Sequence, residues 1–167
     1  NCFSQVAKGE MSWQQLNDST NSYIEQEDYK SALDWSMKAI SRAKVEFGVL
    51  DSNYCRNLKT IYEIYYNLWD TDKSIEWAKK YSEAAGNYYS ELSAEYISSV
   101  YDLGYLYQLK GDNSKAASLY QEALGLSEKF YEGDNPQRAE MIGNVAYFYK
   151  NINNIPEAEK LYLQALQ

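Results

Sequence analysis

The sequence repeats itself with a period of 42 residues, and this period limits the folds open to the chain more than any other feature. Similar residues recur at that step in four columns, and no insertion is needed to keep the columns in phase. The columns are Leu16, Leu58, Val100 and Ile142; Tyr23, Tyr65, Tyr107 and Tyr149; Ala32, Ser74, Ala116 and Ala158; and Ala39, Tyr81, Ala123 and Ala165. A fixed period of roughly 20–50 residues is typical of repeat architectures, in which each unit buries its apolar face against its neighbours.

Within a repeat, apolar and small residues follow the spacing of two helices. Val100, Leu103, Gly104 and Tyr107 lie at i, i+3, i+4 and i+7, which is one stripe of a helix. A second stripe starts at Ala116, after the breaker and cap residues Gly111 to Ser114. The pattern predicts an all-α fold with eight helices, at about Ser12–Gln26, Tyr29–Phe47, Ser52–Leu68, Lys73–Tyr89, Ser93–Leu109, Ser114–Tyr131, Pro136–Lys150 and Ile155–Gln167.

Small residues and tyrosines have predicted packing roles in these helix pairs. Gly104 and Ala146 on the first helices, and Ala116 and Ala158 on the second, are expected where two helices cross closely. The tyrosine column is expected in the core. Glycine ends one helix and proline opens the next at Gly133-Asp134-Asn135-Pro136, and Pro156 fits the first turn of the last helix.

Composition argues against an enzyme. The chain has no histidine, so histidine-dependent catalytic triads and histidine metal sites are excluded. Its 24 carboxylates are expected to lie on solvated helix faces. Cys2 and Cys55 could form at most one disulfide and no metal cage. We expect both to be free thiols. We therefore expect no catalytic residue, no metal and no cofactor.

Charge and hydropathy restrict the partners. The net charge of −8 opposes binding to nucleic acids and anionic membranes. No apolar run is long enough to span a membrane. The opening residues Asn1 to Gln5 are compatible with the remnant of a removed signal sequence, and so with an extracytoplasmic protein, or with a simple boundary in a longer chain.

The residues of the third and fourth repeats resemble the tetratricopeptide repeat family. Leu103-Gly104-Tyr105-Leu106-Tyr107, followed by Ala116, Tyr120 and Ala123, is similar to its signature. The 42-residue unit, with Gly133, Asp134 and Pro136 between repeats, is similar to the kinesin light chain subtype. The resemblance covers residues 12–167, although Thr20 and Tyr62 replace the small residue in the first two repeats. It implies one domain, 1–167, built as a right-handed α-solenoid of four stacked helix-turn-helix repeats at about 12–53, 54–95, 96–137 and 138–167, the last one truncated.

The resemblance further implies that the first helix of each repeat lines a concave groove that binds a protein or peptide. The groove positions, carried over residue by residue, include Gln14, Asn17, Asn21 and Glu25; Arg56, Lys59, Glu63 and Tyr66; Ser98, Tyr101, Tyr105 and Gln108; and Glu140, Asn144, Tyr147 and Lys150. Aromatic and arginine side chains are typical interface anchors, and asparagine amides can pair with a peptide backbone. The alternative is an idle solvent face on a spacer. Glu63 and Asp102 argue against a clamp for a carboxy-terminal carboxylate, because like charges repel.

Three functional hypotheses follow. The first is a non-catalytic interaction scaffold that binds a protein or peptide segment in this groove. The second is a sensor or regulatory arm of a larger bacterial signalling or caspase-like protease protein, which a reading frame continuing into another domain would favour. An enzyme built on the repeats is a third and weaker hypothesis. Because the last predicted helix carries Leu161, Leu163 and Leu166, we also expect further repeats, a following domain or end-to-end packing between copies.

Overall fold

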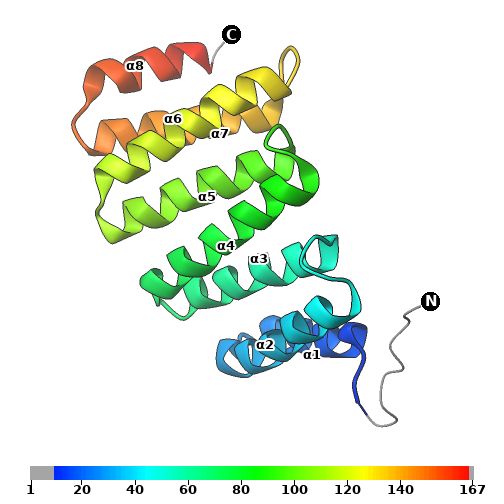
Figure 1. Cartoon of the computed structure of the whole chain (residues 1–167). Helices are drawn as coiled ribbons and strands as arrows, with labels where there is room; N and C mark the ends of the chain where they lie inside the picture. Colours follow the sequence, from blue (N-terminus) through cyan, green and yellow to red (C-terminus); the bar gives the residue numbers. More distant parts are fainter. Residues whose placement is uncertain (1–9, 166–167) are drawn as a thin grey trace. The chain divides into compact units, whose positions relative to one another are not determined.

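The computed structural model describes residues 10–165, and within them the chain folds into eight α-helices and no strands (Figure 1). This confirms the all-α prediction, and each helix end lies within three residues of its predicted position. The helices are α1 Trp13–Glu25, α2 Tyr29–Glu46, α3 Ser52–Asn67, α4 Thr71–Tyr89, α5 Ala94–Lys110, α6 Asn113–Phe130, α7 Pro136–Asn151 and α8 Ile155–Gln164.

The turn inside each helix pair has the same backbone geometry in all four repeats. A residue with positive φ recurs every 42 residues, at Glu27 (57°), Trp69 (61°), Gly111 (84°) and Asn153 (62°). In the first three repeats the following residue caps the next helix, since Asp28, Asp70 and Asp112 each accept a hydrogen bond from a backbone N–H three residues later. Asn154, at the same position in the fourth repeat, makes no such side-chain bond. The 42-residue period is therefore a period of the backbone and not only of the side chains.

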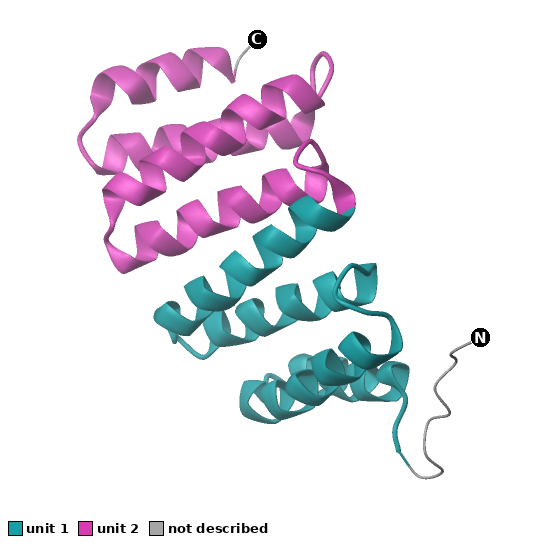
Figure 2. Cartoon of the chain, in the orientation of Figure 1, with its two compact units in different colours: residues 1–88 teal, residues 89–167 magenta. Residues whose placement is uncertain are grey.

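The chain divides into two compact units, residues 1–88 and residues 89–167 (Figure 2). In unit 1, α1 packs on α2 and α2 on α3. The Ser74 hydroxyl on α4 donates to the Tyr62 carbonyl on α3 at 2.9 Å, and the rings of Tyr62 and Tyr81 stack 5.9 Å apart. In unit 2, α5 packs on α6, α6 on α7 and α7 on α8. Each unit thus contains two helix pairs.

The repeat columns lie largely in the core. The aliphatic column from Leu16 to Ile142 is buried throughout, and so is the small-residue column from Ala32 to Ala158. The tyrosine column is less uniform than predicted: Tyr107 and Tyr149 are buried, but Tyr23 and Tyr65 are half-buried. The Lys73 ammonium nitrogen lies over the Tyr65 ring, 5.3 Å from its centroid, beside the turn between α3 and α4.

Thr20 and Tyr62 are buried although they replace the expected small residue. The Thr20 hydroxyl donates to the Leu16 carbonyl at 3.0 Å, so its polar group is satisfied within α1. Tyr62 is accommodated by its stacking on Tyr81. The first two repeats therefore keep a closed core with different side-chain sizes.

One of the two cysteines, Cys55, lies within the described residues. Cys55 is free and buried, and burial raises the pKa of its thiol, which makes it unreactive. Cys2 and Leu166 lie outside the described residues. Among the helices of residues 10–165, none combines the length and apolar character that crossing a bilayer requires.

Candidate functional site

The helix α5 presents three of the predicted groove residues along one stripe. Tyr101, Tyr105 and Gln108 follow one another at i, i+4 and i+7, so the helix places them on one face. Tyr105 is exposed, whereas Tyr101 and Gln108 are half-buried. The middle residue of the stripe is therefore open to solvent, and the residues at its two ends are partly covered by the protein.

Tyr101 is held in place by contacts to two other helices. Its ring packs against that of Tyr120 on α6, with centroids 5.3 Å apart and planes tilted by 44°. Its hydroxyl is hydrogen-bonded to the side chain of Asn144 on α7. Burial raises the pKa of Tyr101, and the hydrogen bond to Asn144 opposes that effect. The phenol is consequently neutral at physiological pH and can serve as a positioned hydrogen-bonding group.

Gln108 is tied to the core beneath this stripe. The hydroxyl of Tyr120, a buried residue, donates to Gln108 Oε1 at 2.8 Å. Burial and the nearby phenols of Tyr101 and Tyr105 raise the pKa of Tyr120. Since its oxygen is engaged, Gln108 retains its amide N–H groups for a ligand. Tyr120, which the sequence analysis names only as part of the repeat signature, thus also supports the stripe. This role becomes visible only once α5 and α6 are packed together.

Helix α7 contributes the second half of the surface in unit 2. Asn144, Tyr147 and Lys150 are exposed and lie at i, i+3 and i+6. The Tyr147 ring has 57% of its area open to solvent, while its neighbour Phe148 is buried against Tyr120 with centroids 5.1 Å apart. The bond between Tyr101 and Asn144 joins the α5 and α7 faces. We call Tyr101, Tyr105, Gln108, Asn144, Tyr147 and Lys150 the tyrosine surface.

The remaining predicted residues lie on α1 and α3 of unit 1. Asn21, Arg56, Glu63 and Tyr66 are exposed and Lys59 is half-buried. The Lys59 ammonium lies 3.8 Å from Glu63 Oε1, so these two charges partly compensate each other. Asn17, which was expected on the same face, is buried. The first repeat therefore offers one exposed groove residue fewer than predicted, because Asn17 lies on the buried side of α1.

The exposed residues of these surfaces are mostly phenols, amides and cations. Neutral phenols, amides and a few cations provide hydrogen bonds and apolar contact area, as interface residues do. Among residues 10–165, no cluster of histidine, cysteine, aspartate or glutamate has the geometry to hold a metal ion. Carboxylates do lie near the tyrosine surface, since the charges of Asp102 and Glu140 contribute to the raised pKa of Tyr101. They make the surroundings of this surface acidic.

Comparison with known proteins identifies the repeats. Residues 96–167 match the family model described as tetratricopeptide repeat. No curated protein matches the chain in sequence. This match confirms, over residues 96–167, the resemblance noted in the sequence.

Three solved structures have a similar fold. BtubC (BKLC) from P. vanneervenii superposes with a TM-score of 0.78 at 18% identity, over 87% of this chain and 58% of that one. The nearly identical TPR-like repeats assigned to a Podosopora anserina kinesin light chain give 0.76 at 13% identity, over 91% and 72%. MamA gives 0.64 at 14% identity, over 92% and 76%. This chain thus spans a little over half of the BtubC structure, and these likenesses establish an all-α repeat fold.

Proposed function

We propose that this protein is a non-catalytic scaffold that binds a segment of another protein on the tyrosine surface. Tetratricopeptide repeats in general suggest protein–protein interaction. The observation that carries the specific proposal is the placement of Tyr101, which is fixed by Tyr120 and Asn144 beside the exposed Tyr105 and Tyr147. A regulatory arm of a larger protein would use the same surface.

The physical argument rests on prior ordering of the binding groups. A tyrosine ring offers a large contact area with few torsions to restrict, and its hydroxyl can still form a hydrogen bond. Because Tyr101 and Gln108 are already held by intramolecular contacts, little conformational entropy is lost when a ligand binds. Asn144 and Gln108 supply amides that can pair with the backbone of an extended peptide.

Charge favours particular ligands on the surface of each unit. Lys150 in unit 2, and Arg56 and Lys59 in unit 1, would attract acidic or carbonyl-rich segments, whereas Asp102 and Glu140 lie close to Tyr101. The charged contacts weaken as salt rises, and the aromatic contacts do so less. We expect micromolar affinity, on the order of −8 kcal/mol.

A display selection tests this proposal directly. A phage-displayed library of random peptides is selected on the wild-type protein, and recovered peptides are titrated against a Tyr105→Ala/Tyr147→Ala variant. Both side chains are exposed, so the variant should fold normally and lose at least tenfold in affinity.

The control replaces Leu109 with alanine, because this side chain is 47% exposed and its helix position lies outside the tyrosine surface. That variant should bind as the wild type does. Tyr101→Phe keeps the ring but removes the hydroxyl bonded to Asn144, and should weaken binding less than the double change. Selected peptides that bind the double variant with unchanged affinity would show that the tyrosine surface is not the binding site.

A further inference from the structure

Trp69, in the turn between α3 and α4, is the most exposed large hydrophobic residue of the described chain. Its side chain is 89% exposed, and its backbone has a φ of +61°. The equivalent turn residues in the other repeats are Glu27, Gly111 and Asn153. Left-handed backbone favours glycine and asparagine, and an exposed indole gains no packing in return. The fold of the repeat therefore does not account for a tryptophan at this position.

A groove in the same unit has the size and lining to receive an indole. It runs along α2, has a volume of about 720 Å³ and is lined by Met11, Trp35, Met37 and Val45, with Lys38 and Arg42 also in its wall. Met37 is 39% exposed and Val45 is 69% exposed. We call this the α2 groove.

Two of the apolar residues that line the α2 groove, Met37 and Val45, have polar counterparts in the second and third repeats. Trp35, in contrast, recurs as Trp77, and the Met37 position is apolar again in the fourth repeat, as Leu163. One and two periods later, the position of Met37 is occupied by Lys79 and Gln121. The position of Val45 is occupied by Asn87 and Lys129. All four of these polar residues are exposed, so the repeat fold places this part of the helix in solvent. Apolar residues in α2 thus form a surface patch that the packing of the repeats does not require.

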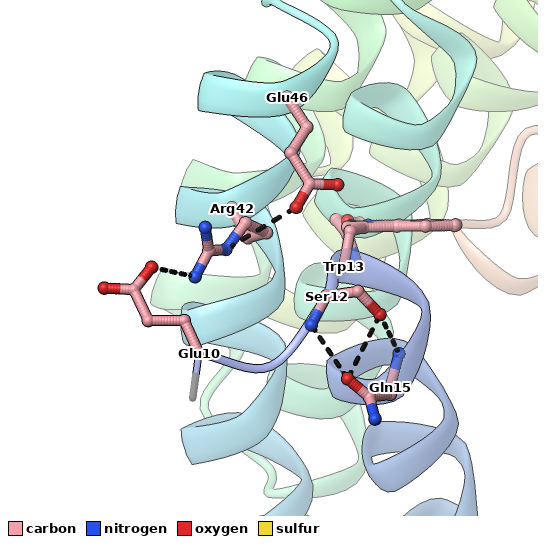
Figure 3. A network of polar contacts seen from close by, with 7 residues as sticks. Glu10, Ser12, Trp13, Gln15, Arg42 and Glu46 are labelled. Atoms are coloured by element: carbon pink, nitrogen blue, oxygen red, sulfur yellow. Dashed lines mark hydrogen bonds and ion pairs between the residues drawn. The ribbon is translucent and has the colours of Figure 1, made fainter. Parts of the chain in front are cut away.

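The two surfaces have opposite charge in a chain whose net charge is −8. Helix α2 carries four basic and two acidic residues, while residues 63–76, around Trp69, carry four acidic and one basic. Lys38 lies over the Trp35 ring with its nitrogen 4.4 Å from the centroid, so a cation already faces an indole in this groove. Arg42 is held at the groove edge by Glu10, at 2.6 Å, and lies 3.7 Å from Glu46 (Figure 3).

We propose that Trp69 of one copy inserts into the α2 groove of a second copy. The indole packs on Met37 and Val45 beside the Lys38 ammonium, and the acidic turn faces the basic helix. Anchor and groove are different patches of one unit, so a head-to-tail contact between two copies leaves a free anchor and a free groove at the ends of the assembly. This contact does not involve the tyrosine surface, and it differs from end-to-end packing through α8.

The experiment uses two variants that each remove one side of the contact. Trp69→Gly removes the anchor at a position whose backbone suits glycine, and Val45→Asp places a charge on an exposed groove residue; both should fold. Sedimentation velocity from micromolar to millimolar concentration should show concentration-dependent self-association for the wild type and at least a tenfold weaker association for each variant. Mixing the two variants should restore a dimer and nothing larger, because one intact anchor and one intact groove remain.

Matched controls occupy the same repeat positions elsewhere. Glu27→Gly changes the turn of the first repeat, and Asn87→Asp adds a charge on α4 at the position equivalent to Val45; both should associate as the wild type does. A wild type that stays monomeric throughout this range would overturn the proposal. Self-association that survives Trp69→Gly, or is lost in Leu163→Asp instead, would overturn it in favour of another surface.

Discussion

A Cβ atom added to Gly104 on α5 would lie 2.8 Å from Cδ1 and 2.9 Å from Cε1 of Tyr120 on α6. Real Cβ atoms do not approach aromatic carbons so closely, which means that the Tyr120 ring occupies the space that the missing side chain leaves open. The side chain that fills the space beside Gly104 is thus the aromatic ring of Tyr120. One repeat of 42 residues earlier, the large and the small side chain are exchanged. Tyr62 lies at the position of Gly104 and Ala78 at that of Tyr120, and both are buried.

Gly104→Ala is expected to lower the free energy of unfolding by about 1–3 kcal/mol, although alanine is the better helix former. The Tyr120 ring cannot easily give way, because it packs on Tyr101 and Phe148 and bonds to Gln108. Urea denaturation measures the change. Gly125→Ala on α6 is the control: nothing lies within 4 Å of its added Cβ, so it should stabilise the protein by up to about 1 kcal/mol. Equal effects at the two glycines would contradict the close contact.

Trp69→Gly is expected to raise the free energy of unfolding by about 1 kcal/mol, since it relieves left-handed strain and removes an exposed side chain. The reciprocal change, Gly111→Ala at the same turn position, should lower it by about the same amount. Thermal and urea unfolding of the two variants provide the comparison. A destabilised Trp69→Gly protein would indicate that the indole packs against its own chain.

Tyr107→Ala should destabilise the protein by about 3 kcal/mol, because it leaves a cavity at a residue that is 8% exposed. Tyr147→Ala should change stability by less than about 0.5 kcal/mol, since its ring is 57% exposed. Circular dichroism at increasing urea concentration distinguishes the two variants. The reverse order of effects would mean that the buried and exposed faces of these helices are interchanged.

Alkaline pH should destabilise unit 2. Burial raises the pKa of Tyr101, Tyr120 and Tyr149 above the ordinary value of 10.0, so above that pH the unfolded chain releases protons that the folded chain retains. Their stabilising contribution is complete below pH 10.0 and is lost as the pH rises towards the folded-state values. The free energy of unfolding, measured from neutral pH to about pH 11, should fall at the alkaline end.

Tyr120→Phe separates this effect from general alkaline damage. The variant loses its hydrogen bond to Gln108, which lowers stability by about 1 kcal/mol at neutral pH. Its alkaline decline should be shallower than that of the wild type, because one titrating phenol is gone. An identical decline would mean that Tyr120 ionises with its ordinary pKa in the folded protein.

Local signals in the sequence were sufficient to predict where the helices begin and end. The i, i+3, i+4 spacing and the cap residues reflect interactions between residues close in the chain, and the 42-residue period repeats these signals four times. The predicted helix limits therefore agree with the observed ones. The buried aliphatic column follows for the same reason, because helical phase decides which side of each helix is apolar.

Contacts between helices were decided only by the tertiary structure. Gly104 could be identified as a position needing little space, but the residue that fills that space depends on how far α5 and α6 are shifted along each other. The support of Tyr101 by Tyr120 and Asn144 depends in the same way on three helices packed together. Trp69 was present in the sequence as an ordinary aromatic residue, and its exposure and left-handed backbone emerged only from the folded turn. Periodicity determines which residues of a helix face inward, whereas side-chain volumes on neighbouring helices determine which of them meet.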